Sequence, residues 1–425
     1  MLLAVFSSDF WLVRFFFILS GYATVSVPVI LLVYYVRRKT ASKEYACCNF
    51  VDGSFKQLTF LDSFLLKFAV GRPDYELMIF DTVKLNTTVP QKTSLMSNCS
   101  HLLLCFSGLQ ITLVSMGYIQ EKIMTKGYLS TVDHQLWKFE NTQFLVFVNR
   151  VFAIFFCVFY LSVNWKREPV HAPPLYKHSF ASLSNTLSSW CQYEALKYVS
   201  FPAQIVCKAS KVLPTMLMGF IVRGERYGRT ECLCAFTLAF GASLFFLSNN
   251  SAAFGSNGNL LKTFYGRVTT ISGILLMSGY LLFDAFTLNW QKKLFDVRPR
   301  VSRYQMMFGV NIFSMFLCFV TLIEEGAFTA PFRFLATHEG FARDVFLLSL
   351  SGALGQVVIY STIERFGPSV FAIMMTLRQI TSILLSTIAY GHPMSAWSIL
   401  GLSVTFVAIF GSIYNRYLHT LRTNR

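Results

Sequence analysis

Three basic residues lie within apolar stretches that otherwise suit the interior of a lipid bilayer: Lys208, Lys211 and Arg378. In the helix expected after Pro202, Lys208 lies about 9 Å and Lys211 about 13 Å from the helix start. Arg378 lies about 16 Å beyond Gly367, close to the middle of a hydrocarbon core about 30 Å thick. On insertion scales each central cation costs roughly 2.5–3.5 kcal/mol. A costly cluster of this kind predicts a binding site for an anion.

Acidic residues offer another explanation for these cations, in which each charge is neutralised within the protein. Asp284 lies within a further apolar run, whereas Glu194 and Glu364 lie near helix ends on neighbouring segments. Asp284 and Glu194 could therefore act in gating or form ion pairs with basic residues. No acid on the two cation-bearing helices can neutralise all three charges. We therefore expect an unmatched cluster, with structural ion pairs as the alternative.

Polar side chains recur at helical spacing in two of the apolar runs. They are Ser182, Asn185, Ser189 and Gln192 in one run, and Thr376, Gln379, Ser382 and Ser386 in the other. Small hydroxyl side chains also serve as packing contacts between helices in lipid, and packing is the better interpretation for any single serine. The amides Asn185, Gln192 and Gln379 are larger, and we predict that they hydrogen-bond a base or ribose. Tyr193 and Tyr360 are the candidates for stacking on an aromatic ring.

The composition excludes a water-soluble enzyme. Of the 425 residues, 54% are hydrophobic and 14% are charged, and the formal net charge is +16; a soluble domain carries about 25% charged residues. The basic residues are scattered singly between apolar runs, so a nucleic-acid partner is not expected. The histidines and cysteines lack metal-binding spacing and no Walker A loop is present, so we expect no metal, no cofactor and no ATP hydrolysis.

Ten apolar runs are each long enough to cross a bilayer. They are residues 101–119, 143–165, 177–198, 202–222, 231–248, 268–288, 304–323, 344–363, 367–388 and 395–414. Lys and Arg are about twice as frequent in one set of the intervening loops, which places both ends of the ten-helix unit in the cytosol. Residues 10–36 could form an additional helix or a signal-anchor. The sequons at Asn86 and Asn98 are not assigned to a side, and the sequon at Asn249 is expected on the lumenal side.

Two segments of the chain read alike at a constant offset of 167 residues. The first begins YEALKYVSF at Tyr193 and the second begins YSTIERFGP at Tyr360; Lys211 then falls on Arg378. Five helices in each half would give the halves opposite orientations, which is the inverted-repeat arrangement of many secondary transporters. We therefore predict an all-α membrane protein with ten transmembrane helices in a 5+5 inverted repeat.

The pattern of runs and repeats predicts four parts along the chain. Residues 1–100 form a leader with one apolar segment and a polar linker. Residues 101–265 and 266–416 form the two five-helix repeats, and residues 417–425 form a basic cytosolic tail. The substrate site is expected where the two repeats meet, near the middle of the membrane.

Several strings within this unit resemble a known family. They are SSWCQYEALKYVSFPAQIVCKASKVLPTMLMG from Ser188, GYLLFDAFTLNWQ from Gly279, QMMFGVN from Gln305, and FGPSVFAIMMTLRQITSILLS from Phe366, followed by YGH. Over about residues 101–416 the chain is similar to the nucleotide-sugar transporter family of the drug/metabolite transporter superfamily. The branch it most resembles carries PAPS (3′-phosphoadenosine 5′-phosphosulfate) into the Golgi lumen. The resemblance does not extend into the first hundred residues.

The resemblance implies a function and a set of site residues. It implies a multi-pass carrier in the Golgi membrane, with the endoplasmic reticulum left open, that exchanges PAPS for adenosine 3′,5′-bisphosphate and supplies sulfation of glycosaminoglycans and proteins. It places the family's cationic positions at Lys208, Lys211 and Arg378. Its expected partners are these two nucleotides and the lipid bilayer, and a homodimer is left open.

Two other functions remain as alternatives. A nucleotide-sugar antiporter would carry a UDP- or GDP-linked sugar, whose diphosphate brings only two negative charges, whereas PAPS carries about four. Three cations therefore favour PAPS. A multi-span membrane transferase is the remote alternative, because the longest predicted lumenal loop, residues 324–343, contains acids and a histidine but no recognisable motif.

Overall fold

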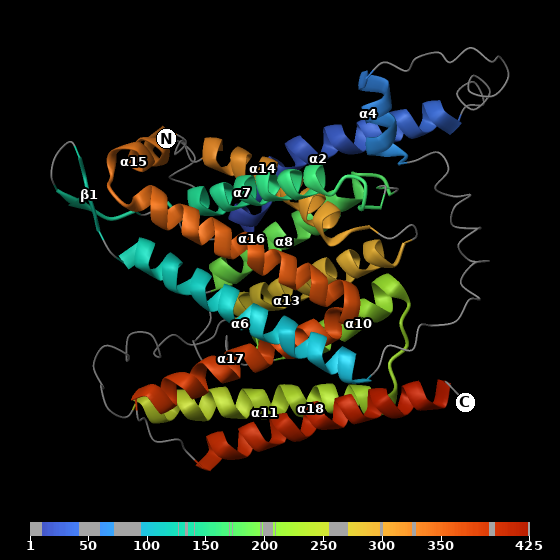
Figure 1. Ribbon diagram of the computed structural model, residues 1–425, viewed down its shortest axis with the longest axis vertical. Helices are drawn as coiled ribbons and strands as arrows, with labels where there is room; N and C mark the ends of the chain where they lie inside the picture. The colour runs from blue at the N-terminus through green and yellow to red at the C-terminus, as the bar shows by residue number, and fades with distance from the viewer. Residues whose placement is uncertain are drawn as a thin grey trace. The chain divides into compact units, whose positions relative to one another are not determined.

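The computed structural model is almost entirely helical where it describes the chain (Figure 1). It describes residues 11–41, 60–71, 95–125, 127–131, 135–139, 141–169, 171, 173–195, 198, 207–208, 210–254, 271–297, 301–324, 329–390 and 396–423. The helices are α2 (Trp11–Ala41), α4 (Phe60–Ala69), α6 (Leu95–Thr125), α7 (Thr142–Val163), α8 (Lys177–Ala195), α10 (Val212–Arg223), α11 (Arg229–Phe254), α13 (Ile271–Asp296), α14 (Arg303–Glu324), α15 (Thr329–Thr337), α16 (Phe341–Phe366), α17 (Pro368–Tyr390) and α18 (Ala396–Thr423).

Each of the ten predicted apolar runs overlaps one of these helices. Among the residues that the structure describes, five segments are long and apolar enough to cross a membrane: Leu19–Lys39 in α2, Cys99–Gln120 in α6, Gln143–Val163 in α7, Arg303–Ile323 in α14 and Phe341–Phe366 in α16. The chain is therefore a helical membrane protein. The count of ten spans in a 5+5 repeat remains a prediction.

The chain divides into two compact units that interleave along the sequence. Unit 1 comprises residues 1–94, 112–183 and 294–357, and unit 2 comprises residues 95–111, 184–293 and 358–425. Each unit therefore takes segments from both predicted sequence repeats. Because a division by contacts need not follow an internal duplication, the predicted repeat boundaries remain a prediction.

In unit 1, the predicted N-terminal apolar segment is a helix, α2, which pairs with α4. Val33 and Val36 of α2 pack against Ala69 at the end of α4. Arg37 donates from Nε to the carbonyl oxygen of Ala69, at 3.1 Å, and its guanidinium lies over the ring of Tyr176. These contacts attach the leader to the remainder of unit 1.

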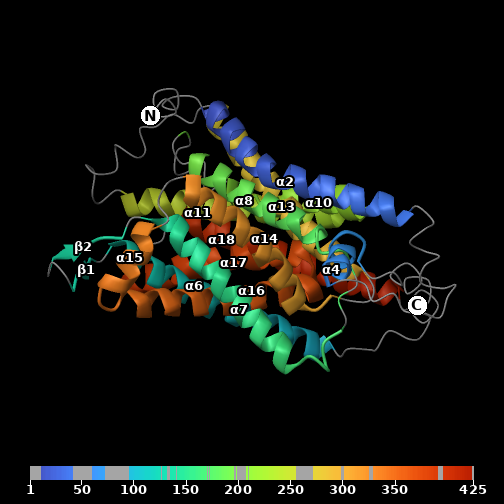
Figure 2. The same ribbon diagram turned by 90° about the horizontal axis from the view of Figure 1, so that it is seen from above.

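Unit 1 also contains a short β-hairpin that an all-α prediction misses. Strands β1 (Tyr128–Leu129) and β2 (Leu136–Trp137) pair antiparallel, and Figure 2 shows them beside α15. Aromatic side chains hold this region together: Tyr128 and Phe139 pack on Phe341, at centroid distances of 5.1 and 4.7 Å. The predicted lumenal loop 324–343 therefore contains a helix and packs on the hairpin.

In unit 2, α11 and α18 lie side by side over much of their length (Figure 1). Two glycines make this close approach possible. A Cβ on Gly241 would lie 2.7 Å from Oγ1 of Thr405, and a Cβ on Gly401 would lie 2.5 Å from the backbone nitrogen of Phe245. Small residues at such crossings let helix backbones approach closely in lipid, where packing replaces the hydrophobic effect as the source of association.

The reversal between α16 and α17 fits the predicted Gly/Pro turn. Gly367 lies between the two helices with φ of 85°, a left-handed conformation that glycine adopts without steric cost. Pro368 is the first residue of α17, where its missing N–H costs nothing because that group has no partner within a helix. This turn positions the helix that carries Arg378.

Candidate anion-binding site

Three segments of unit 2 bring the predicted charges together: the start of α10, the middle of α13 and the middle of α17. Lys211 is the residue before α10, and its carbonyl oxygen accepts hydrogen bonds from the backbone and the hydroxyl of Thr215. The regular helix therefore begins after Lys211. The predicted depth of 13 Å assumed a continuous helix from Pro202, and residues 201–206 lie outside the described part of the chain.

Lys211 forms an ion pair with Asp284. The Nζ atom lies 2.5 Å from Oδ2 of Asp284, and the two side chains are 14% and 18% exposed. The expectation that the cluster lacks a protein counter-charge is therefore wrong for Lys211, and the alternative of an ion pair with Asp284 is correct. The predicted run ended at residue 288, whereas α13 extends to Asp296, which places Asp284 near the helix centre.

Arg378 differs from Lys211 in lacking such a partner. Within the part of the chain that the structure describes, Arg378 makes no ion pair, and its Nε is buried without a hydrogen-bond acceptor. Its charge acts on Lys211 electrostatically, as does that of Lys208, which is half-buried. The ring of Phe371, one helix turn into α17, lies 6.0 Å from the Lys211 ammonium. Lys211 is therefore close enough to interact with both Lys208 and Arg378, and the carboxylate of Asp284 faces Lys211.

The predicted polar stripe on α8 divides into packing contacts and half-buried amides. Ser182 is buried and shares a hydrogen bond of 2.8 Å with Ser314 of α14, as the packing interpretation predicted. Ser189 is exposed and donates to the carbonyl oxygen of Asn185 in its own helix. Asn185 and Gln192 are half-buried, so both remain candidates for a polar ligand.

The other predicted site residues occupy several environments. On α17, Gln379 is half-buried next to Arg378, and Thr376 bonds within the helix. Tyr360 of α16 and Glu194 in the last turn of α8 are both buried. The side chains of Tyr193, Ser382 and Ser386 lie outside the described residues. The roles assigned to all of these residues remain predictions.

Two polar residues within apolar helices were missed in the sequence, the buried Asn289 and the half-buried Arg150. Asn289 on α13 is fully buried; it donates to the carbonyl oxygens of Thr215 and Ala285 and accepts from Nε of Arg223. Arg150 on α7, in unit 1, donates to Asn311 at 3.1 Å. Both residues could have been identified from the sequence, because an amide or a guanidinium within an apolar run needs a hydrogen-bond partner.

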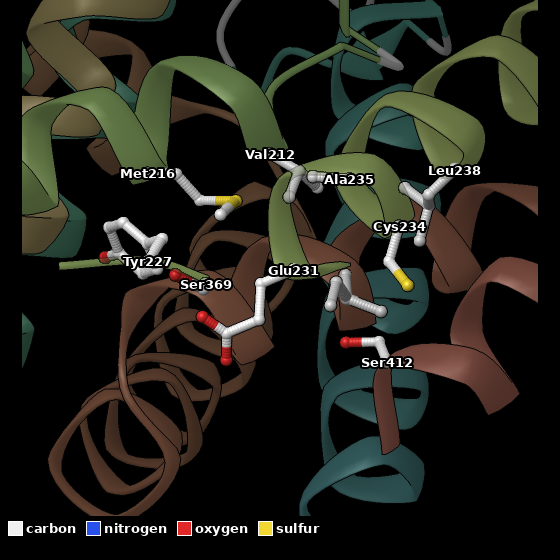
Figure 3. A pocket seen from close by; sticks show the side chains of 10 residues that line it. Val212, Met216, Tyr227, Glu231, Cys234, Ala235, Leu238, Ser369 and Ser412 are labelled. Carbon is white, nitrogen blue, oxygen red and sulfur yellow. The ribbon is translucent and has the colours of Figure 1, made fainter. Parts of the chain in front are cut away.

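Two cavities open in unit 2 close to the α10–α11 loop. The smaller, about 20 Å³, has space for about one water molecule, and Figure 3 shows Glu231 and Tyr227 on its wall with the apolar Val212 and Met216. The larger is about 170 Å³. Neither is lined by Lys211 or Arg378, so the predicted central chamber is not tested by them.

Residues 101–416, about three quarters of the chain, match the sequence pattern of the UAA transporter family. The chain belongs to this family. The UAA transporter family match begins at residue 101, where the predicted ten-helix unit also begins. Membership makes the protein a transporter and excludes the membrane-transferase alternative.

Several named transporters are similar to this chain over most of its length. A Caenorhabditis elegans protein named adenosine 3′-phospho 5′-phosphosulfate transporter 1 is 51% identical over 412 residues, which covers 96% of this chain and 92% of the relative. The human protein of that name is 41% identical over 410 residues, covering 96% and 88%. The Arabidopsis thaliana UDP-galactose/UDP-glucose transporter 5 is 37% identical over 309 residues, covering 72% and 84%. The alignments with the first two include most of the leader, so similarity extends further than the predicted resemblance.

Proposed function

We propose that the protein carries PAPS across a membrane. The relatives named for transport of this nucleotide align over 96% of the chain at 51% and 41% identity, against 37% over 72% for the plant UDP-sugar carrier. Similarity therefore favours the sulfate donor over a nucleotide sugar. In the structure, the observation that carries the proposal is Arg378, a partly buried guanidinium that pairs with no carboxylate among the described residues.

The ion pair changes the charge argument for the substrate. With Asp284 included, the formal charge of the cluster falls from +3 to +2. This excess suits any nucleotide with a pair of phosphate charges, so the number of cations alone does not separate PAPS from a UDP-linked sugar. The preference for PAPS rests on the relatives, and the cluster supports the broader class of phosphorylated nucleotides.

Arg378 is the group best suited to bind the first phosphate or sulfate. A guanidinium presents a planar fork that matches two oxygens of an oxyanion, whereas a lysine acts as a point charge. The anion then competes with Asp284 for Lys211, with Lys208 adding positive charge nearby. The adenosine would form hydrogen bonds with the amides of Asn185, Gln192 and Gln379. The candidates for stacking on its base are Tyr193 and Tyr360.

The transport cycle follows from this competition. The two five-helix halves rock around the site, so that it faces one side of the membrane at a time. Asp284 partly neutralises the empty cluster, and the substrate replaces it as the partner of Lys211. Adenosine 3′,5′-bisphosphate, the by-product of sulfation, is the counter-substrate in this scheme, and the Golgi membrane is the location. Assembly as a homodimer is compatible with it.

Uptake of labelled PAPS into liposomes that contain the purified protein tests the proposal. Arg378→Ala should reduce uptake at least tenfold, because a charge-assisted bidentate contact contributes roughly 1.5–3 kcal/mol. Arg333→Ala is the matched control, since Arg333 is an exposed arginine on α15. Near-normal uptake by Arg378→Ala would remove this residue from the site.

Competition with unlabelled nucleotides separates the two substrate classes. If the proposal is correct, adenosine 3′,5′-bisphosphate displaces labelled PAPS at concentrations where UDP-galactose does not. Inhibition by UDP-galactose at equal or lower concentration would instead assign the protein to nucleotide-sugar exchange. Loading the liposomes with the bisphosphate should accelerate uptake if transport is exchange.

A further inference from the structure

A second arginine within an apolar helix lies in unit 1, on α7. Arg150 lies seven residues after Gln143 and thirteen before Val163, the two ends of the segment of α7 that is long enough to cross a membrane. It is therefore about 10 Å from one end of that segment and about 20 Å from the other. An arginine so far inside an apolar span is costly, and such residues mark the pathways of ligands and ions.

The Arg150 side chain is directed at a buried group of a neighbouring helix. Its Nη1 donates to Oδ1 of Asn311 on α14 at 3.1 Å, and Asn311 is fully buried. A long basic side chain near a helix end can instead extend along its own helix to the membrane surface, where water relieves the cost of its charge. The hydrogen bond to a buried amide is incompatible with that arrangement, so Arg150 keeps its charge within the protein.

No carboxylate offsets this charge within the part of the chain that the structure describes. The guanidinium makes one hydrogen bond there, to Asn311, and no ion pair. Asp344, the acid of α16 that belongs to unit 1, is already engaged: it lies 2.6 Å from Nζ of Lys122 and accepts a hydrogen bond of 2.9 Å from the hydroxyl of Tyr128. Because a guanidinium has five N–H groups, most of those on Arg150 remain open to a ligand.

A network of amides on α7, α14 and α16 holds the guanidinium in place (Figure 1). Nδ2 of Asn311 donates to a backbone carbonyl of its own helix and to Oε1 of Gln356 on α16, both at 2.7 Å. With its nitrogen used in this way, Asn311 presents its oxygen to Arg150. Ser349 of α16 donates to Oδ1 of Asn149, the residue before Arg150, at 2.7 Å. A group that is fixed before its ligand arrives loses less entropy on binding.

Gln356 adds an uncharged donor to this network. Because its Oε1 accepts from Asn311, its Nε2 is free to donate, and Nε2 has no acceptor among the described residues. Arg150 and Gln356 are both half-buried, whereas Asn311, which contacts both, is fully buried. The polar groups that remain open on Arg150 and Gln356 are therefore donors. Such a pair suits a ligand group that consists of acceptors, which is an oxyanion.

We propose that Arg150 binds a phosphate group of the carried nucleotide, with Asn311 as its positioning residue and Gln356 as an additional donor. The inference rests on the proposed function, because the carried nucleotide supplies the phosphate. Arg150 is distinct from the cluster around Arg378, whose residues all belong to unit 2. A guanidinium can bind two oxygens of a phosphate at once. A lipid headgroup lies outside the hydrocarbon core, so a soluble nucleotide is the better match for the depth of Arg150.

Equilibrium binding to the purified full-length protein in detergent tests this contact without relying on transport. The probes are adenosine 3′,5′-bisphosphate, adenosine 3′-phosphate and adenosine 5′-phosphate. Arg150→Gln should raise the dissociation constant of the bisphosphate roughly tenfold or more, because it removes a charge-assisted contact. For the monophosphate that lacks the phosphate bound by Arg150, the same substitution should change the dissociation constant by less than about twofold, because the two changes then remove the same interaction.

Three further variants complete the test. Arg150→Lys keeps the charge but loses the planar fork, so it should weaken bisphosphate binding by less than Arg150→Gln does and with the same dependence on one phosphate; it tests the contact even if Arg150→Gln fails to fold. Asn311→Ser should show that dependence in smaller size, since it releases the guanidinium. Arg167→Gln is the matched control: it removes an exposed arginine from the turn after α7 and should change binding by less than about twofold, because exposed charges are screened.

The outcomes separate this inference from the proposed function. Equal weakening of all three probes by Arg150→Gln would show a structural role for the arginine and overturn the inference. Bisphosphate binding by Arg150→Gln within twofold of wild type would overturn it as well, and in both cases the proposed function would stand. Absence of bisphosphate binding by the wild-type protein would instead refute the proposed function, and this inference with it.

Discussion

Asp284→Asn tests how the cation cluster is balanced, because it keeps the side-chain size and removes the charge paired with Lys211. The two charged atoms are 2.5 Å apart, and at an effective dielectric constant of about 20 unit charges at this separation attract by about 6–7 kcal/mol. Desolvation offsets part of this attraction. Removing one partner of a buried pair costs about 3–5 kcal/mol, because the other charge is left uncompensated. The variant should therefore melt at a lower temperature than wild type.

A ligand should recover much of this loss. An anionic nucleotide supplies the negative charge that Asp284→Asn lacks, and it no longer competes with a carboxylate for Lys211. The assay is thermal unfolding of the purified protein in detergent, with and without adenosine 3′,5′-bisphosphate. We expect the ligand to raise the melting temperature of Asp284→Asn by more than it raises that of wild type, since binding to the folded state alone stabilises that state.

Two further variants make the test decisive. Asp296→Asn removes an exposed carboxylate from the end of the same helix; its effect on stability should be at most about 1 kcal/mol, because ion pairs of exposed side chains contribute little, and the ligand response should stay near wild type. Lys211→Gln combined with Asp284→Asn removes both charges and should recover much of the lost stability, because neutral replacement of a buried pair is often tolerated. Wild-type stability in Asp284→Asn, together with an unchanged ligand response, would refute the role of Asp284 as the counter-charge.

Three other predictions concern the scaffold. Gly401→Ala should separate α18 from α11 and lower the free energy of unfolding by about 1–3 kcal/mol through overpacking. Gly411→Ala is the control and should be tolerated, because its Cβ would contact Sγ of Cys234 at an ordinary distance of 3.6 Å. The melting temperatures of the two variants test this difference. Gly219→Ala should displace Tyr227, because the added Cβ would overlap the Tyr227 hydroxyl, and it should lower the melting temperature through overpacking. Burial lowers the pKa of His171 to about 4 in the folded protein, whereas the unfolded chain has the ordinary histidine pKa of about 6.5. Between these two values the unfolded state binds the extra proton, so the free energy of unfolding falls by about 1.4 kcal/mol for each pH unit as the pH drops towards 4. Melting between pH 7 and pH 5 should show a smaller loss in His171→Gln than in wild type.

The sequence alone determined the class of the protein and the positions of its helices. Runs of apolar residues about twenty long must form helices in lipid, because the backbone finds no other hydrogen-bond partners there. All ten predicted runs consequently overlap helices of the structure. The turn at Gly367 was predictable for a similar local reason, because Gly-Pro both ends one helix and begins the next. The small hairpin at Tyr128 was not, since two-residue strands carry almost no periodicity.

The candidate site was only partly predictable. Lys211 and Arg378 were identified because a cation in an apolar run is costly wherever the chain folds. Whether that cost is met by an anionic ligand or by a carboxylate depends on which helices are neighbours, which is a long-range property. Lys211 and Asp284 are 73 positions apart in the chain and 2.5 Å apart in space. No local pattern specifies that contact.

The larger cavity of unit 2, which is lined in part by Arg223, Lys292 and Arg365, illustrates the same division. Each of its three cations, taken alone, is an ordinary basic residue at the end of an apolar run, and the sequence specifies only that such ends carry positive charge. Tertiary structure brings Arg223, Lys292 and Arg365 to one hollow and engages the nearby acid with Arg223 and Tyr227. The burial cost of each residue is therefore determined locally, whereas the partner that offsets it is chosen by the packing of helices far apart in the chain.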